Sequence, residues 1–441
     1  MTDESASPDV SARLHLASAD DRRDILNDLM AAHPDGRLIL IGAMESRNNL
    51  RGLPFPGGKL RGATLAFADL HKADFSNSNL SQADMRHAAL EGANLRRADL
   101  TEVDLTDANL GEADLGESLL EDAKLERASL RFADLRDAVL ESANLKDADF
   151  WGAILAKADL NQVSARAAHF GEAVADAADF SKADLRDADF ANAVLVGALF
   201  VGADLRGASL RGAKLSGADF SGAALQGVDL SQCELQGAFW EGAILDHTRL
   251  GQDQIGRVGE EVARNPSGAA GAYLILERNF GALGDSSAAS WAYLKRRRMQ
   301  KMAALADARK AVSESRLVSA LGHSATFIGD TLVEWICDYG ESLLRTFSTL
   351  IGVYLAFIVI YGVSDGVVRV TILPQGQLLS VTHRLTDLAV YSIMAMTTSG
   401  LADGVLKPAN LWISFLGGLQ ILIGIFLTGL LGFVAGNRIR R

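Results

Sequence analysis

The chain has 441 residues and a formal net charge of −12 at pH 7. A chain with this negative charge is not attracted to nucleic acid as a whole. We therefore exclude nonspecific electrostatic binding and expect no nucleic-acid partner. The length allows two or three domains. The two cysteines have no metal-binding spacing and suit a reducing compartment. The first residues lack a basic region followed by an apolar core, so we expect no signal peptide.

Residues 1–49 are predicted to form a polar tail followed by a helix and a strand. The helix is indicated by apolar residues at helical spacing between Ile25 and Met30, and the strand by the run Arg37–Ala43. A short helix and strand at this place would cover the open first coil of the repeat that follows.

From about Leu60 to Leu250 the sequence repeats every five residues. Every fifth residue is Leu or Phe, as at Leu70 and Phe75, and Ala usually stands two residues earlier. A period of five fits neither a helix nor a straight strand, so the chain must turn within each repeat. Four such sides close a square coil of about twenty residues. About 39 repeats then make nearly ten coils, stacked at ~4.8 Å into a rod of roughly 45–50 Å.

The pattern Ala-(Asp/Asn)-Leu-x-x resembles the pentapeptide-repeat family. The resemblance implies a right-handed quadrilateral β-helix over residues 50–250. Ala165 and Ala175 occupy large-residue positions on either side of Phe170. We therefore expect a distortion or loop near residues 163–176, and we favour a packing irregularity over a binding site there.

Acidic side chains gather in the repeat between Glu102 and Glu126. Some pentapeptide-repeat proteins mimic the charge of DNA, so the resemblance raises a topoisomerase-binding rod as one hypothesis. The other interpretation is that Asp before Leu belongs to the repeat and stays solvated. We favour the second interpretation, because a DNA mimic has no need of the apolar segments that follow.

Residues 251–323 are predicted to be a helical connector, with helices at Gln252–Asn265, at Ala269–Phe280 and from Trp291 to about Ser315. The third helix carries the one basic run, which consists of Lys295, Arg296, Arg297, Arg298 and Lys301. Two interpretations stay open for this basic cluster: a solvated helix face, or contact with anionic lipid head groups on the cytoplasmic side of a membrane.

The remaining residues are predicted to be a membrane domain. Residues 324–343 form an amphipathic helix lying at the bilayer surface. Residues 344–441 hold two apolar stretches, at about 346–363 and 411–434, each long enough to cross a hydrocarbon core of ~30 Å as a helix. Residues 385–404 between them are too short and too polar to cross, which favours a re-entrant segment capped by Thr386 or Asp387.

The stretch from Tyr391 to Asp403 resembles the pore helix and selectivity filter of two-transmembrane potassium channels. The family pattern is an aromatic residue, Ser, two apolar residues, Thr or Ala, an apolar residue, then Thr-Thr-Val-Gly-Tyr-Gly-Asp, and Pro408 follows where the family often has proline. The resemblance assigns a filter to Thr397, Thr398, Ser399, Gly400, Leu401, Ala402 and Asp403. Ala402 stands where the family has a second glycine, and Ala resists the positive φ that Gly adopts freely. The resemblance therefore supports a tetrameric pore more strongly than potassium selectivity.

We thus predict a homotetrameric channel for a monovalent cation in the inner membrane of a bacterium, with both termini cytoplasmic. The repeat would dock a cytoplasmic protein partner. Gly424 is either a bend or a packing contact in the second span. The alternative function is a membrane-anchored repeat protein that conducts nothing. No catalytic constellation or nucleotide-binding loop is present in the sequence, so we expect neither an enzyme nor a cofactor.

Overall fold

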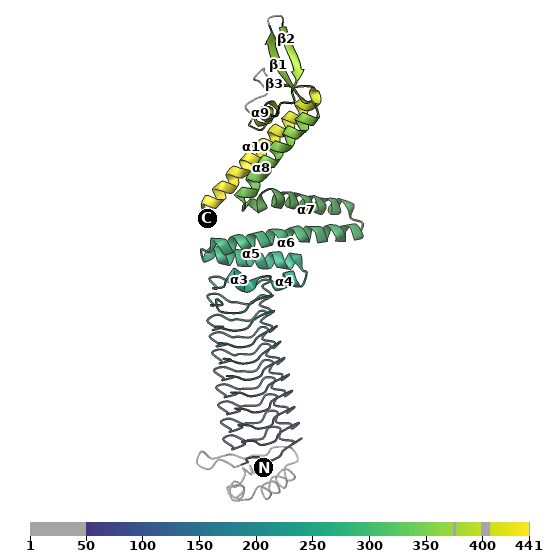
Figure 1. The fold of residues 1–441 in the computed structure, drawn as a ribbon. Coiled ribbons are helices and arrows are strands. Elements are labelled where there is room, and N and C mark those ends of the chain that lie inside the picture. Colours follow the sequence, from purple (N-terminus) through teal and green to yellow (C-terminus); the bar gives the residue numbers. More distant parts are fainter. Residues whose placement is uncertain (1–49, 374–375, 398–405, 441) are drawn as a thin grey trace, which may run out of the picture. The chain divides into compact units, whose positions relative to one another are not determined.

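The computed structural model describes residues 50–373, 376–397 and 406–440 (Figure 1). The helix and strand predicted within residues 1–49 lie outside the described residues. The chain divides into two compact units, Met1–Met299 and Gln300–Arg441, and each is considered by itself below.

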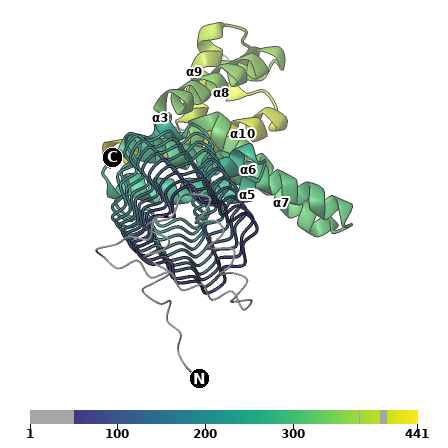
Figure 2. The same cartoon turned by 90° about the horizontal axis from the view of Figure 1, so that it is seen from below.

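The repeat forms a parallel β-solenoid. Parallel bridges join residues twenty apart, from Pro54 with Asp74 to Asp229 with Arg249, so each coil has four five-residue sides, as the period predicts. The coils lie directly over one another in Figure 2. The Leu, Phe and Ala residues of the pattern point inward, and almost all of them are fully buried. The ladder includes Pro54, so the coils begin before the clear pattern starts at Leu60.

Where the residue before a central Leu or Phe is Asp or Asn, its side chain builds the turn that follows it. Asp74 Oδ1 accepts a hydrogen bond from the backbone N–H of Ser76 at 3.0 Å, and the same contact recurs along the solenoid. The next residue, Asn77, has a φ of 57°, and Ser78 N–H closes the turn by donating to Phe75 O. Asp and Asn suit this place because their short side chains bond to the backbone two residues on. The prediction that Asp before Leu is part of the repeat is therefore confirmed, and these side chains remain partly exposed.

No distortion occurs at residues 163–176, so the distortion or loop predicted there is wrong. The ladder continues through Ser164, His169 and Val174, and Ala165 and Ala175 are buried like their larger counterparts. The explanation lies in the neighbouring rings. Phe170 stacks on Phe150 and Phe190, with centroid distances of 4.9 and 4.8 Å, and Phe180 meets it edge-on. These rings fill the room that the two alanines leave.

Four helices follow the last coil: α3 (Gln252–Ile255), α4 (Gly259–Val262), α5 (Pro266–Ala282) and α6 (Ser286–Ser313). The single helix predicted over Gln252–Asn265 is wrong, because the chain turns at Gly256, which has a φ of 60°. Pro266 starts α5, and the Asn265 side chain caps it by accepting from Gly268 N–H at 3.0 Å. Proline fits the first helical position because no helix partner awaits its missing N–H.

The last coil of the solenoid has no further coil to pair with, and polar side chains from these helices bond to its backbone instead. Gln254 Nε2 donates to Leu230 O and Cys233 O at 2.9 and 2.8 Å. Asn279 donates to the Thr248 carbonyl at 2.8 Å. These bonds satisfy strand-edge groups that would otherwise be buried without partners.

In the described part of the second unit, five helical segments and three strands follow the end of α6. They are α7 (Leu317–Cys337), the 3-10 turn η1 (Asp338–Gly340), α8 (Leu343–Val363), β1 (Val367–Leu373), β2 (Gly376–Val381), α9 (Leu385–Met396), β3 (Leu406–Pro408) and α10 (Leu411–Arg440). The amphipathic helix predicted at 324–343 thus begins earlier, at Leu317, and ends at Cys337, where Asp338 takes a left-handed conformation. The strands form an antiparallel sheet in the order β2-β1-β3, which the sequence analysis did not predict.

Two helices of the described residues are long and apolar enough to cross a membrane. They are α8 and the Leu411–Gly436 part of α10, and they correspond to the two predicted spans. The helix α9, at 12 residues, is too short to do so.

Candidate functional site

The short helix α9 ends halfway along α10. A Cβ atom on Gly424 would lie 2.5 Å from the carbonyl oxygen of Met396, so the last turn of α9 touches the α10 backbone. Gly424 is 13 residues beyond Leu411, at the middle of the apolar stretch that ends at Gly436. One turn earlier on both helices, Ser392 faces Gln420. The two helices therefore run side by side in the same direction.

A buried polar network holds α9 between α8 and α10. Gln420 Nε2 donates to Ser392 Oγ at 2.7 Å and to Ser392 O at 3.2 Å, while Gln420 Oε1 accepts from the Tyr361 hydroxyl at 2.8 Å. Ser392 Oγ in turn donates to the Tyr354 carbonyl at 3.3 Å. Gln420, Ser392 and Tyr361 have no exposed surface. Because the apolar surroundings offer these polar groups no other partner, this network fixes the position of α9 along α8 and α10.

Aromatic packing surrounds the network. The Tyr361 ring meets the Tyr391 ring edge-on, with centroids 5.1 Å apart, and Phe357 packs beside Tyr361. Tyr354 donates its hydroxyl to Ala389 O at 3.3 Å. The Tyr391 hydroxyl is buried and has no hydrogen-bond partner among the described residues.

The start of α9 is fastened to the sheet. Asp387 Oδ2 accepts from Thr382 Oγ1 at 2.7 Å and lies 3.4 Å from Arg369 Nη1. The predicted cap by Thr386 or Asp387 is wrong: the N-cap residue is Arg384, and no side chain caps the helix. No sequence pattern indicates that Asp387 would bind β1, because Arg369 lies 18 residues away along the chain.

The chain returns to the same sheet after α9. Leu406 of β3 pairs with Arg369, and Ala409 N–H donates to Gly366 O at 3.0 Å, just beyond the end of α8. The path thus leads from the sheet to the middle of α10 and back to the sheet. Of the predicted filter, only Thr397 is described, and its Oγ1 donates to Ile393 O at 2.9 Å. The other six filter residues, Thr398 to Asp403, lie outside the described residues.

The structure favours the packing alternative for Gly424. The contact with Met396 leaves no room for a side chain, and α10 is one helix from Leu411 to Arg440. By contrast, a Cβ atom at Gly418 or Gly429 would meet nothing within 4 Å. The sequence contains several glycines in this helix and offered no signal to tell them apart.

The predicted basic cluster is engaged in ion pairs on α6. Lys295 lies 3.4 Å from Glu261 and Arg296 lies 2.8 Å from Glu277, both in the first unit. In the second unit, Lys301 pairs with Glu334 of α7. These three basic side chains are 16–23% exposed, so a freely solvated face is wrong for them. Arg297 and Arg298 also have interactions, and no lipid is present to test the other interpretation.

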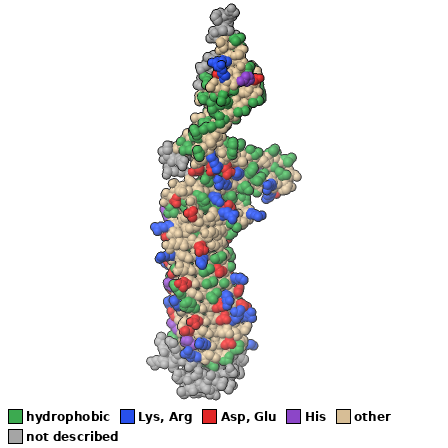
Figure 3. All heavy atoms as spheres, in the orientation of Figure 1, with side chains coloured by type: hydrophobic (Ala, Val, Ile, Leu, Met, Phe, Trp, Pro, Cys, Tyr) green, Lys and Arg blue, Asp and Glu red, His purple; other side chains and the backbone are tan. Residues whose placement is uncertain are grey.

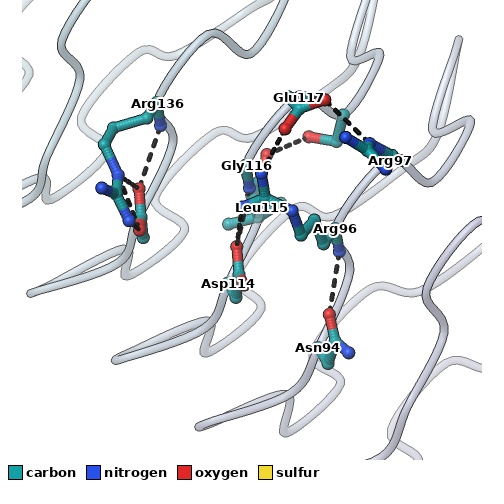
Figure 4. A network of polar contacts seen from close by, with 10 residues as sticks. Asn94, Arg96, Arg97, Asp114, Leu115, Gly116, Glu117 and Arg136 are labelled. Atoms are coloured by element: carbon teal, nitrogen blue, oxygen red, sulfur yellow. Dashed lines mark hydrogen bonds and ion pairs between the residues drawn. The ribbon is translucent and has the colours of Figure 1, made fainter.

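Acidic side chains on the solenoid surface are paired along the coil stack. Arg97 donates to Glu117 at 2.8 Å, and Arg96 also bonds to Glu117 (Figure 4). Arg127 holds Asp107, one coil away, through two bonds of 2.7 Å. The hydrogen bond from Arg127 lowers the pKa of Asp107. Part of the acidity predicted from residues 102–126 is therefore neutralised locally.

Comparison with known proteins assigns the solenoid to a family. The model for pentapeptide repeats matches in eight overlapping copies between residues 49 and 252. The solved structure of HetL, a pentapeptide-repeat protein of the cyanobacterium Nostoc involved in heterocyst differentiation regulation, is 33% identical over 50% of this chain and 92% of its own, with a TM-score of 0.32. A trypsin-treated form of QnrB1, a plasmid-mediated fluoroquinolone resistance protein, is 19% identical over 55% and 96%, with a TM-score of 0.27. A pentapeptide-repeat protein of the Arabidopsis thaliana thylakoid lumen is 29% identical over 24% and 63%, with a TM-score of 0.13. The comparison with curated proteins gives no match.

The class defined by the fold is a parallel β-solenoid joined to a helical region with two apolar helices. The repeating coil and the matching model agree over the same residues. Residues 49–252 are a pentapeptide-repeat domain and belong to that family.

Proposed function

We propose that residues 344–441 form the pore domain of a homotetrameric channel for monovalent cations, and that the repeat domain docks a cytoplasmic protein partner. The observation that carries the proposal is the path of α9. It starts at the sheet, ends beside Gly424 at the middle of α10, and the chain is back in the sheet at Leu406. A helix that goes halfway and returns is the arrangement of a re-entrant segment.

The surface of α8 and α10 supports a membrane location. Only 17% of the apolar window in α8 and 22% of that in α10 are buried, whereas the core helix of a soluble protein is mostly buried. Hydrophobic side chains gather over these helices and α7 in Figure 3. Among the large apolar residues, Leu411 is 90% exposed and Val363 is 83% exposed. Such a surface needs lipid or other copies of the chain against it.

The surface of α7 supports its placement along the bilayer surface. Leu317, Leu321, Ile328, Leu332 and Trp335 recur at helical spacing and are each more than half exposed. On the same helix, Glu334 pairs with Lys301. A helix with one apolar and one charged face lies in the membrane interface. The short turn η1 then leads directly into α8.

Four copies would bring four α9 ends around one axis. The C-terminal end of a helix carries partial negative charge, which favours a cation near Met396 and Thr397. The carbonyls of Thr397 to Asp403 would then replace the water shell of the ion. Two spans and one re-entrant segment put both termini on one side, and the C-terminal arginines together with the Lys/Arg run upstream of α8 favour the cytoplasm of a bacterial inner membrane.

Reconstitution tests this proposal. The purified chain is inserted into planar bilayers, and reversal potentials are recorded under gradients of potassium, sodium and chloride. The proposal predicts currents that follow the cation gradients and are lost in Gln420→Leu. Stable insertion of the wild-type chain without any conductance would instead establish the membrane-anchored repeat protein.

A further inference from the structure

A groove of about 620 Å³ lies between α7 and the first half of α8. Trp335 of α7 forms one side of it. On α8 it is lined by residues that recur along one face of the helix, namely Arg345, Thr349, Gly352, Val353 and Ala356. The groove thus has Arg345 at one end, the hydroxyl groups of Ser348 and Thr349 beside it, and the small residues Gly352, Val353 and Ala356 along the rest.

Arg345 places a guanidinium at the beginning of α8. Its side chain is 51% exposed, and its Nη1 atom lies 3.4 Å from the Glu334 carbonyl oxygen and 3.7 Å from Asp338 Oδ2. These contacts involve one of the three nitrogens, while a guanidinium has five N–H donors. The Glu334 carboxylate is paired with Lys301 and so does not compete for Arg345. A phosphodiester can therefore bind at Arg345 through charge-assisted hydrogen bonds.

The rest of the groove has the dimensions of one half of a bilayer. From Arg345 to Ala356 the helix rises by about 16 Å, at 1.5 Å per residue. One leaflet of a hydrocarbon core ~30 Å thick has about this depth. A Cβ atom at Gly352 would meet nothing within 4 Å, so the middle of the groove is open. Trp335 is 69% exposed at the charged end, where tryptophan is enriched in membrane proteins.

We propose that this groove binds one anionic phospholipid, with its phosphate on Arg345 and an acyl chain along Gly352 and Ala356. The proposal rests on the membrane location in the proposed function and is independent of conduction. Occupancy would stabilise the junction of α7 and α8, since the lipid contacts both helices.

Retention of lipid by the full chain tests the site. The protein is purified from nanodiscs containing equal amounts of phosphatidylglycerol and phosphatidylcholine, and bound lipid is counted by native mass spectrometry. We expect phosphatidylglycerol to be retained preferentially. Arg345→Gln should weaken its retention about tenfold, the value of a charge-assisted hydrogen bond. Gly352→Leu should abolish retention of either lipid by filling the groove, and its Cβ atom would meet nothing within 4 Å. Lys407→Gln removes one positive charge from β3 and should change nothing.

Four results would overturn the proposal. Equal retention of the two lipids would show that Arg345 selects no head group. Unchanged retention in Gly352→Leu would place the lipid elsewhere, and displacement by inorganic phosphate would show a simple anion site. Cross-linking of two subunits through Gly352→Cys would assign the groove to a second copy of the chain. Selective retention in a chain that conducts no ions would reject the channel and keep the lipid site.

Discussion

The repeat domain and the α8–α10 region differ in how much of their apolar side chains they bury. Along the solenoid, each coil finds its partner twenty residues away in the same chain, and the central Leu and Phe side chains are buried. In the helical region, the hydrophobic core of a single chain is a small cluster around Tyr361 and Tyr391. Leu411, Trp412 and Leu422 are each more than 60% exposed. The first region buries its large apolar side chains within one chain, whereas the second leaves many of them exposed.

The largest effect is expected in the solenoid core. Phe190→Ala removes a ring that stacks on Phe170 at 4.8 Å and meets Phe180 edge-on. We expect the free energy of unfolding of the repeat domain to fall by about 3–5 kcal/mol, as for other buried phenylalanines. Phe132→Ala, at a ring that is 56% exposed, is the control and should cost less than about 0.5 kcal/mol. Urea denaturation, monitored by hydrogen exchange, measures the free energy of unfolding of both variants. Equal effects would mean that the rings do not form a common core.

The second-largest effect is expected in the buried polar network around Gln420. Gln420→Leu removes the acceptor for Tyr361 and the donor to Ser392. With three bonds lost at ~0.6–1 kcal/mol each, we expect the free energy of unfolding of the α8–α10 region to fall by about 2–3 kcal/mol. Leu422→Ala, at a residue that is 66% exposed, should have little effect on thermal unfolding in detergent. If Gln420→Leu proved as stable as wild type, the network would not be what holds α9.

Gly424→Ala tests the contact between α9 and α10. The added methyl group would lie 2.5 Å from Met396 O and 3.1 Å from its Cα atom, so the helices must separate. Overpacking of this kind costs about 1–3 kcal/mol. Gly429→Ala is matched in helix and residue type, and its methyl group meets nothing within 4 Å. Thermal unfolding of the two variants should therefore differ. Equal melting temperatures would return Gly424 to the role of a bend.

The smallest effect is expected at the end of the solenoid, where Glu260 accepts from Trp240 N–H at 2.8 Å. Burial raises the pKa of Glu260, so the folded state holds its proton more tightly than the unfolded state does. The free energy of unfolding must then fall as the pH rises above 4.5, the ordinary pKa. Glu260→Gln keeps the oxygen acceptor without the charge, so it should be more stable than wild type at pH 7. The difference should vanish below pH 4.5, and exposed Glu241→Gln should show no such trend. A stability difference between Glu260→Gln and wild type that did not change with pH would exclude the titration of Glu260 as its cause.

The fold of the repeat domain was predictable because almost every repeat has the same residue pattern. A period of five with Ala two residues before Leu determines the coil, the inward face and the number of residues per coil. The two alanines at 165 and 175 misled the prediction, because Phe150 and Phe190, which stack on the Phe170 between them, belong to the neighbouring coils. The end of the solenoid was not predictable, since Gln254 and Asn279 resemble any other polar residue until their partners are known.

The helical region was predictable in its helices but not in its contacts. Apolar length predicted α8 and α10, and the polar middle segment predicted a short α9. The partners of Gln420, the difference between Gly424 and Gly429, and the pairing of Lys301 with Glu334 all depend on residues distant in sequence. The filter assignment from Thr398 to Asp403 stays a prediction.

The side from which position 397 can be reached tests the account most directly. In a chain lacking Cys233 and Cys337, cysteine is introduced at Thr397, at Lys407 or at Leu422, and reconstituted vesicles are treated with a membrane-impermeant thiol reagent on one side at a time. The account predicts that positions 397 and 407 react from the same side, that reaction at 397 blocks the current, and that position 422 does not react. Reaction of 397 and 407 from opposite sides, or no reaction at 397, would contradict a re-entrant α9.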